Sequence, residues 1–278
     1  MQLYHKTNQQ IAALVTKNYS SSFYLSTLLF DKKTRDSIFG IYGFVRYADE
    51  IVDTFHGYNK EYLLLKFEKD LIEALEQKIS LNPILDAFQT TVNEYNIPYE
   101  YIDAFLNSMK MDLGKKLYLS KAETEKYVYG SANVVGLMCL KVFCNNKPEL
   151  FEKLVKPAEM LGSAFQKVNF LRDLKADTEG LDRFYFSNFD HNNFSETNKK
   201  ELITEIENEF AIAYEGIKEL PGRSKLAVLT AYKYYLSLLR KIKNTEAQQI
   251  LRKRIRISNT YKLTLMAKAA IQYKFNLF

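Results

Sequence analysis

Apolar residues recur at three- and four-residue spacing along most of this chain, which is the periodicity of helices with one buried face. Two series show it clearly: Ile38, Ile41, Tyr42, Val45 and Ala48, then Leu63, Phe67, Leu71 and Leu75. Only 10 Gly and 5 Pro interrupt 278 residues, which is too few for the many turns of a sheet protein. A hydrophobic content of 47% is enough for a substantial core. The sequence therefore predicts an all-α fold of long helices joined by short loops.

Turn and capping residues divide the chain into these predicted helices. Breaks are expected near residues 31–33, 57–59, 80–83, 96–98, 120, 145–148, 178–198 and 221–223. The stretch 178–198 is polar and aromatic, and its length is typical of an active-site loop rather than of a linker. No long internal repeat is visible. We therefore expect residues 1–278 to form a single domain.

The sequence shows no sign of secretion or of membrane insertion. Cys139 and Cys144 lie in an apolar stretch without metal-ligand spacing, which predicts buried thiols in a reducing compartment. The first residues lack the apolar core and cleavage site of a signal peptide. No stretch approaches the roughly 18 uninterrupted apolar residues that indicate a membrane span. We expect a cytoplasmic protein that does not cross a membrane.

Positive charge is concentrated at the end of the chain. From Lys218 onward, 14 Lys and Arg residues stand against only Glu219 and Glu246, a net charge of +12 where the whole chain carries +6. Such a segment indicates an anionic partner: nucleic acid, a phosphorylated substrate or an anionic membrane. Nucleic acid fits least well, because carboxylate pairs are interleaved and no nucleic-acid-binding motif is present.

Two pairs of aspartates have their members four residues apart. Asp49 and Asp53 lie in RYADEIVD, and Asp173 and Asp177 lie in NFLRDLKAD. On a helix each pair shares one face, where like charges repel by a few tenths of a kcal/mol. Apolar neighbours make an uncompensated carboxylate costlier still. A bound cation would remove both penalties, whereas a solvated helix face is the simpler explanation for either pair alone.

The neighbours of these aspartates favour a magnesium–diphosphate site. Gln166 and Asn169 extend the second pair into a polar stripe on an apolar helix, and Arg46 shares the face of Asp49. Mg²⁺, for which Mn²⁺ can substitute, prefers oxygen ligands and is commonly bound by one or two carboxylates together with substrate phosphates. Arginine binds phosphate oxygens directly.

Other chemistries fit the sequence less well. Paired carboxylates also catalyse glycoside hydrolysis, but that reaction does not explain two i, i+4 pairs on separate helices. No Ser/His/Asp set is apparent, and the three histidines, His5, His56 and His191, are expected at the surface. Neither a glycine-rich phosphate loop nor a dinucleotide-binding fingerprint is present.

Four segments resemble motifs of the squalene and phytoene synthases, in the same order along the chain. The first is SSSFYLSTLLFDKKTRDSIFGIYGFVRYADEIVD at 20–53, and the second is YVYGSANVVG at 127–136. The third is LGSAFQKVNFLRDLKADTEGLDRFYF at 161–186, with an Arg-x-Tyr pattern at Arg183 and Tyr185. The basic closing segment is resembled by RIRIS at 254–258 together with Lys262.

The resemblance implies an isoprenoid synthase fold, a helical bundle in which two aspartate motifs face each other across the mouth of a central cavity. It implies that three Mg²⁺ ions and a substrate diphosphate are bound by Asp49, Asp53, Asn169, Asp173 and Asp177. Substrate-binding residues implied in the same way are Phe23, Tyr42, Arg46, Gln166, Asn169, Arg183, Tyr235 and Arg254. Tyr127 joins the four aspartates as an implied catalytic residue.

Aromatic rings stabilise carbocations, and the chain has 20 Tyr and 19 Phe. The rings near the motifs, which we expect to line the cavity, are Phe23, Tyr24, Tyr42, Phe44, Tyr127 and Phe165. Three positions depart from the family pattern: Ala176 replaces an acid, Ser131 replaces Val and Asn133 replaces Gly. One metal contact and part of the cavity wall are therefore expected to differ.

The reaction that the resemblance implies joins two prenyl diphosphates head to head. Ionisation gives an allylic cation, the second diphosphate attacks it to form a cyclopropylcarbinyl diphosphate, and a second ionisation with rearrangement and proton loss completes the product. The DEIVD sequence is closer to the phytoene type, which favours two geranylgeranyl diphosphates as substrates, release of two diphosphates and no NADPH.

Other functions stay open at this point. A C30 squalene or dehydrosqualene synthase acting on farnesyl diphosphate, or a relative that forms hydroxysqualene, has the same motifs. A non-catalytic partner subunit with the same fold is a further alternative. Because substrate and product are long hydrocarbons, the surplus basic residues also predict a peripheral contact with the anionic inner face of the plasma membrane. We expect a monomer or a weak dimer.

Overall fold

The computed structural model describes residues 1–114, 118, 120–145, 147–180, 185 and 194–278, apart from the side chains of residues 176–180. This part of the chain is helical and contains no strand, which confirms the predicted all-α class. Its elements are α1 (Gln2–Tyr19), α2 (Ser21–Thr27), α3 (Lys32–Asp53), α4 (Lys60–Gln77), α5 (Pro83–Tyr95), α6 (Tyr99–Gly114), α7 (Lys121–Val128), the π-helix η1 (Tyr129–Asn133), α8 (Val134–Cys144), α9 (Pro148–Gly180), α10 (Glu196–Glu219), α11 (Gly222–Lys243), α12 (Ala247–Ile250) and α13 (Asn259–Lys274).

Most of the predicted loop at 178–198 lies outside the described residues. The other predicted breaks coincide with helix ends, several of which short polar side chains cap. Asp31 accepts a hydrogen bond from the Thr34 amide at 3.1 Å at the start of α3, and Asn59 accepts one from the Tyr62 amide at 3.0 Å at the start of α4. These bonds satisfy amides that have no partner within the helix. The sequence analysis missed three further breaks, at Ser20, 244–246 and 251–258.

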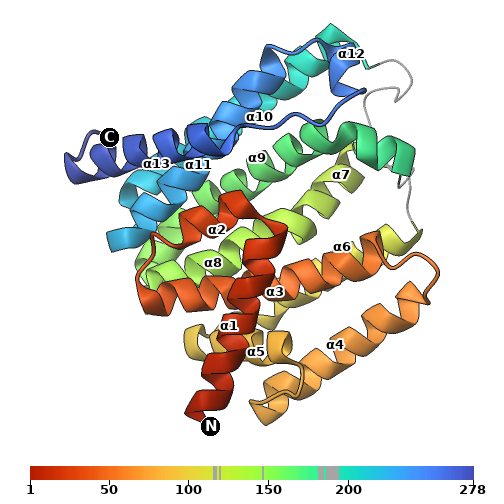
Figure 1. Cartoon of the computed structure of the whole chain (residues 1–278), viewed down its shortest axis with the longest axis vertical. Helices are drawn as coiled ribbons and strands as arrows, with labels where there is room; N and C mark the ends of the chain where they lie inside the picture. The colour runs from red at the N-terminus through yellow and green to blue at the C-terminus, as the bar shows by residue number, and fades with distance from the viewer. Residues whose placement is uncertain (115–117, 119, 146, 181–184, 186–193) are drawn as a thin grey trace.

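The longest helix, α9, crosses the bundle and packs against α8 and η1 as well as α10 (Figure 1). Two glycines allow these close contacts. A Cβ atom on Gly216 of α10 would lie 2.3 Å from Pro157 Cβ, and one on Gly162 would lie 2.7 Å from the Ala132 carbonyl oxygen. Because neither approach is sterically possible with a larger residue, these glycines determine how closely α10 and η1 approach α9.

The largest apolar core lies around α3, α5 and α6 and is built on aromatic rings. Phe44 stacks on Phe88 with ring centroids 4.0 Å apart and contacts Phe105 at 5.3 Å. Phe44 is therefore a core residue and not a cavity residue, which corrects the sequence prediction. Tyr24 was also placed wrongly, because its ring stacks on Phe39 at 5.6 Å instead of lining the cavity.

The helical stretch Lys121–Cys144, which spans α7, η1 and α8, is long and apolar enough to cross a membrane, a property that the sequence analysis did not foresee. Length and composition alone are weak evidence for a span, and half of the apolar window is buried inside the fold. Gly130 packs so tightly that a Cβ would lie 2.5 Å from the Ala104 carbonyl oxygen of α6. We therefore interpret the stretch as a core helix.

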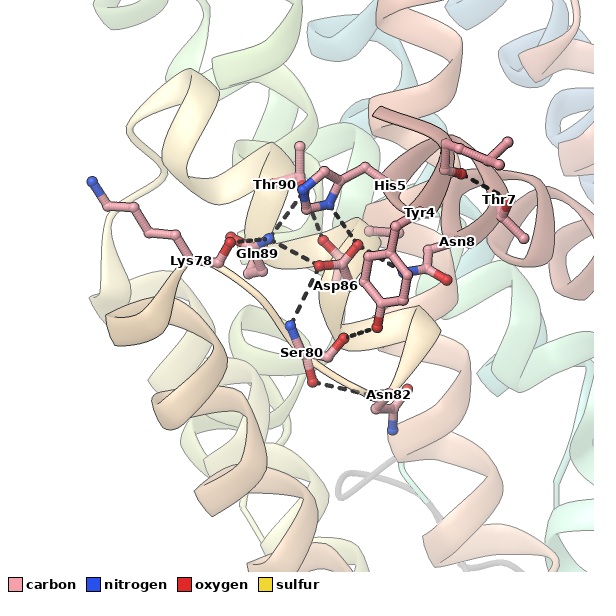
Figure 2. A network of polar contacts seen from close by, with 12 residues as sticks. Tyr4, His5, Thr7, Asn8, Lys78, Ser80, Asn82, Asp86, Gln89 and Thr90 are labelled. Carbon is pink, nitrogen blue, oxygen red and sulfur yellow. Dashed lines mark hydrogen bonds and ion pairs between the residues drawn. The ribbon is translucent and has the colours of Figure 1, made fainter. Parts of the chain in front are cut away.

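The N-terminal helix is joined to α5 by a buried carboxylate (Figure 2). Asp86 is fully buried, and its Oδ2 lies 2.8 Å from both His5 Nδ1 and Asn8 Nδ2 of α1. Its Oδ1 accepts hydrogen bonds from the Ser80 amide and the Gln89 side chain, each at 3.3 Å. His5 is thus a half-buried structural residue and not the surface residue that we expected.

Candidate active site

A cavity of about 490 Å³ lies inside the bundle, bounded mainly by α2, α3, η1, α8, α9 and α11. Along α9 its lining extends from Leu154 to Asp173, a length of ~28 Å at 1.5 Å per residue. The end near Leu154 is apolar and includes Phe143 and Leu220. The other end is polar, and the predicted site residues in the wall are Phe23, Tyr42, Arg46, Asp49, Tyr127, Phe165, Gln166, Asn169, Asp173, Tyr235 and Arg254.

Three predicted positions are not placed in this wall. Asp53 ends α3 one turn after Asp49, but it is not among the residues that line the cavity. The side chain of Asp177 and all of Arg183 lie outside the described residues, so their roles stay predictions. Tyr185, of the same Arg-x-Tyr pattern, is buried and stacks on Phe170 with centroids 4.1 Å apart.

Asp49 lies in the polar end of the cavity without a hydrogen-bond donor from the described residues. Burial raises the pKa of Asp49 to about 7; the negative charge of Asp53 adds to this rise, and the positive charge of Arg46 opposes it. A carboxyl group in this setting is costly to ionise unless a cation approaches it. In the folded protein Asp49 is therefore subject to the repulsion from Asp53 that the i, i+4 spacing predicts.

Arg46 is held by two neighbours, and one of its donors is left without a partner. Its guanidinium contacts the Glu50 carboxylate and lies 4.4 Å from the centroid of the Tyr19 ring. Glu50 also accepts a hydrogen bond from the Thr54 hydroxyl at 2.6 Å. The buried Arg46 Nε has no hydrogen-bond partner among the described residues, which leaves one donor of this cavity-lining residue unsatisfied. Sequence reasoning missed Glu50 and Tyr19, although the i, i+4 spacing of Arg46 and Glu50 predicts an ion pair.

Across the cavity Asp173 lies between two arginines. Arg254 Nε is 2.7 Å from Asp173 Oδ1, and Arg172 Nε donates to the same oxygen at 3.0 Å. The Arg254–Asp173 contact joins residues 81 positions apart, so the fold brings the basic C-terminal segment to the aspartate motif. Arg172 lines the cavity and was missed, although it directly precedes Asp173 in the motif.

More basic groups lie beside these arginines. Lys262 is 8% exposed, and its ammonium is 3.1 Å from the Ser21 hydroxyl at the start of α2. Burial lowers the pKa of Lys262, and the positive charges of Arg172 and Arg256 lower it further. Cations that repel one another in this way favour a bound anion. The polar end of the cavity is therefore suited to a diphosphate group.

Aromatic rings form the sides of the cavity near this polar end. Phe23 stacks on Tyr42 at 4.8 Å, and Phe165 stacks on Tyr235 at 3.9 Å. The Tyr235 hydroxyl donates to Asn169 Oδ1 at 3.3 Å, which fixes one amide of the predicted polar stripe. The ring faces are available to a cation in the cavity.

Tyr127 carries a contact that the sequence did not reveal. Its hydroxyl donates to Asp112 Oδ2 at 2.7 Å, and the Tyr118 hydroxyl donates to Asp112 Oδ1 at 3.5 Å. Asp112 is 8% exposed and lies on α6, outside every motif that we recognised. No spacing rule points to it, because Tyr127 is on a different helix.

No group of three or more His, Cys, Asp or Glu side chains in the described part of the chain is arranged to hold a metal ion. The donor set nevertheless fits Mg²⁺, which needs few protein ligands when phosphate oxygens supply the rest. Asp49 and Asp53 lie one turn apart, and burial, together with the negative charge of Asp53, raises the pKa of Asp49, a cost of ionisation that a bound cation would relieve. Neither cysteine is placed to add a ligand; both are free thiols, and Cys139 lines the cavity.

In the described part of the chain, an all-α bundle surrounds a long cavity that is charged at one end and apolar at the other, an arrangement suited to an amphiphile with an anionic head. The chain belongs to the squalene/phytoene synthase family of prenyl transferases, whose family model matches residues 16–261. It is 26% identical over 276 residues to a 15-cis-phytoene synthase of Pantoea ananas, which covers 91% of this chain and 88% of that one.

Two further similarities lie within the same family. A presqualene diphosphate synthase of Sinorhizobium fredii is 30% identical over 188 residues, covering 66% of this chain and 65% of that one. The crystal structure of a dehydrosqualene synthase superimposes with a TM-score of 0.81 over 97% of this chain and 98% of that one, at 22% identity. The isoprenoid synthase fold expected from the sequence is thereby confirmed.

Proposed function

We propose that this protein is a magnesium-dependent phytoene synthase that joins two geranylgeranyl diphosphates head to head and works as a single domain. The observation that carries the proposal is the cavity itself, ~28 Å long along α9, with arginines and aspartates at one end and apolar side chains at the other. Similarity to phytoene synthases over most of the chain supports the C20 substrate.

In this proposal the polar end binds the diphosphate and the apolar end binds the hydrocarbon. Arg46 Nε and the Arg254 guanidinium donate to phosphate oxygens and stabilise the charge that the leaving group acquires. Phe165 and Tyr235 present ring faces to the allylic cation. The apolar wall excludes water, which would otherwise trap the cation as an alcohol.

Mg²⁺ is part of the proposal because the residues at the mouth fit it. Asp49 and Asp53 would bind it on one side, and Asn169, Asp173 and Asp177 on the other. The metal supplies Lewis-acid stabilisation of the departing diphosphate. Asp173 already contacts Arg172 and Arg254, so binding of metal and diphosphate requires these arginines to transfer contacts to phosphate oxygens.

The test is incubation of the purified protein with Mg²⁺ and radiolabelled C20 or C15 diphosphate, with and without NADPH, followed by identification of the product. Phytoene from the C20 substrate without NADPH is the expected result. A C30 product from farnesyl diphosphate, with the C20 substrate ignored, would refute this choice of substrate. A folded protein with no turnover of either substrate would leave a non-catalytic subunit as the function.

A C30 synthase is the second candidate, because the dehydrosqualene synthase structure matches nearly the whole fold. A substitution at Ala132 can distinguish the C40 from the C30 activity by cavity size. Ala132 lies in η1, lines the cavity and packs against Gly162 of α9. Ala132→Phe would remove room for hydrocarbon and is expected to lower the C20/C15 ratio of kcat/KM at least tenfold. An unchanged ratio would show that the chain length is determined elsewhere in the wall.

A further inference from the structure

Helix α4 lies at the edge of the bundle (Figure 1). Its inner face is buried against α3, α5 and α6 through Leu64, Phe67, Leu71 and Ala74. The opposite face is exposed, and we call it the outer face of α4; it consists of Tyr62, Leu65, Lys69, Ile72, Glu73 and Glu76. Leu65 and Ile72 are 50% and 40% exposed, although both are aliphatic. No α4 residue lines the described cavity, so this face has no part in the candidate active site.

The spacing of the outer face is typical of a helix that packs against another helix. Alternating intervals of three and four residues separate its members Tyr62, Leu65, Lys69, Ile72 and Glu76. They form one seam, ~21 Å long at 1.5 Å per residue. A shallow groove follows the seam and is lined by Leu65, Glu68, Lys69, Ile72, Glu73 and Glu76. Single exposed aliphatic residues need no explanation, but an apolar seam with a groove indicates a binding surface.

The charges on this side of α4 are divided between its two halves. Lys66 and Lys69 lie in the N-terminal half, and Glu73 and Glu76 lie in the C-terminal half. Lys66 pairs with Asp70 of its own helix at 2.9 Å. Neither Lys69 nor Glu76 has an ion-pair partner among the described residues. A helix complementary to this face therefore carries acidic groups opposite Lys69 and basic groups opposite Glu76.

A second copy of α4 meets this requirement when it runs antiparallel to the first. A twofold axis between Lys69 and Ile72 places the basic half of each helix opposite the acidic half of the other. Ile72 lies about one residue from this axis, ~1.5 Å along the helix, so the two Ile72 side chains contact each other. The aliphatic stems of the lysines add apolar surface beside them. A parallel pair would place like charges together and is disfavoured.

We propose that the protein forms a homodimer through the outer face of α4, with the two helices antiparallel about this axis. Because the interface is isologous, each complementary charge contact occurs twice. One pair of 18-residue helices is at the low end of specific interfaces, below ~1,200 Å² of buried surface, so the dimer is weak and depends on concentration. The dimer does not rest on the proposed activity, because it uses no residue of the described cavity lining.

Sedimentation equilibrium of the purified full chain over a range of concentrations measures the dissociation constant of this dimer. Wild type is expected to dimerise in the micromolar range. Lys66→Glu with Lys69→Glu makes both halves of the face acidic, and Glu73→Lys with Glu76→Lys makes both halves basic. Each double variant places like charges opposite one another and is expected to weaken the dimer roughly tenfold or more.

Two mixing and reversal experiments test the antiparallel arrangement. An equimolar mixture of the two double variants is expected to form a heterodimer, because one face is acidic and the other basic. Reversal of all four charges in one chain restores the complementary halves only if the helices are antiparallel. The fourfold variant is therefore expected to dimerise with a dissociation constant within about threefold of wild type.

Ile72→Glu tests the apolar part of the seam, because it brings two carboxylates together beside the axis. It is expected to abolish the dimer at every concentration measured. Lys156→Glu with Lys200→Glu is the matched control, since it makes the same change in net charge at exposed positions on α9 and α10. This control is expected to leave the dissociation constant unchanged. Circular dichroism and the melting temperature confirm the fold of each variant.

Three results would overturn the dimer. They are a wild-type protein that is monomeric at every concentration, a dissociation constant that none of the α4 variants changes, and a fourfold variant that stays monomeric. If a double variant does not fold, Ile72→Glu and the fourfold variant provide the same decision. Turnover of prenyl diphosphates is measured separately, and its absence would refute the proposed function without affecting the dimer.

Discussion

Two carboxylates near the two ends of α1 differ in the partners that surround them. Asp86, near His5, receives contacts from four groups that include an amide and two side-chain NH₂ groups. Asp49 lies in the cavity wall beside Arg46, whose guanidinium contacts Tyr19 at the C-terminal end of α1. No described residue donates a hydrogen bond to Asp49. The first arrangement stabilises the fold, whereas the second leaves the protein with a carboxylate suited to a ligand that is not part of the chain.

The largest expected effect is the loss of turnover when a mouth carboxylate is neutralised. Asp49→Asn, Asp53→Asn, Asp173→Asn and Asp177→Asn are each expected to lower kcat by ~100-fold or more, because each removes a proposed metal ligand. The melting temperature of Asp49→Asn is expected to hold or rise, since a repulsive charge is removed. Wild-type kcat in two of these four variants would refute the metal assignment.

Asp86→Asn is expected to lower stability and to leave kcat unchanged, the opposite of the mouth carboxylates. The change weakens hydrogen bonds to a fully buried carboxylate, which is expected to cost about 2–3 kcal/mol of unfolding free energy. Urea unfolding measures the loss, and steady-state kinetics at 25 °C checks that kcat is retained. If Asp86→Asn were inactive while folded, the separation between a structural and a functional carboxylate would fail.

A smaller effect is expected in the pH dependence of stability, which further separates Asp49 from Asp86. The pKa of Asp49 is about 7 in the folded protein against an ordinary 3.8, so the folded state binds this proton more tightly. The contribution of protonated Asp49 to the free energy of unfolding is complete below pH ~4 and is lost as the pH rises to ~7. Without Mg²⁺, Asp49→Asn is therefore expected to be neutral at pH 4 and stabilising at pH 8, by on the order of 1 kcal/mol after allowance for solvent screening.

Thermal unfolding of wild type and Asp49→Asn at both pH values measures this difference. Mg²⁺ competes with the proton for Asp49, so it is expected to raise the wild-type melting temperature more at pH 8 than at pH 6. An equal Mg²⁺ effect at both pH values, or an equal effect on Asp49→Asn, would show that the cation binds elsewhere.

The smallest expected effect concerns the surface next to the cavity mouth. A peripheral contact with an anionic membrane, like the cytoplasmic location, stays a prediction. Arg252 and Lys253 are exposed beside Arg254, whereas Lys268 and Lys274 lie further along the chain on α13. Each basic residue close to a membrane contributes ~1 kcal/mol. Neutralising Arg252 and Lys253 is expected to reduce co-sedimentation with anionic liposomes several-fold, and neutralising Lys268 and Lys274 to have less effect.

The salt dependence of the same experiment is its control, because electrostatic binding declines as the Debye length falls to ~3 Å at 1 M salt. Equal recovery with neutral and anionic vesicles at low salt would exclude the electrostatic contact. Stronger dependence on Lys268 and Lys274 would move the contact away from the mouth to α13.

Features that depend on residues close in sequence were predictable. Helix type, most helix ends and the shared face of Asp49 and Asp53 follow from spacing and capping, because a helix repeats every 3.6 residues. Even here the prediction was imprecise: the buried face of α4 is formed by Leu64, Phe67, Leu71 and Ala74, and the predicted Leu63 and Leu75 are only partly buried. Resemblance to known motifs supplied Tyr127 and Arg254, which no local spacing indicated.

Features that depend on contacts between distant segments were decided only by the tertiary structure. The hydrogen bond from Tyr127 to Asp112 and the ion pair between Arg254 and Asp173 join different helices and loops. Sequence periodicity determines which residues share a face of one helix, but it does not determine which face of another helix packs against it. From the sequence alone, Asp49 and Asp86 are both acids in helical stretches rich in apolar residues. Packing alone gave Asp86 four partners and left Asp49 facing a cavity.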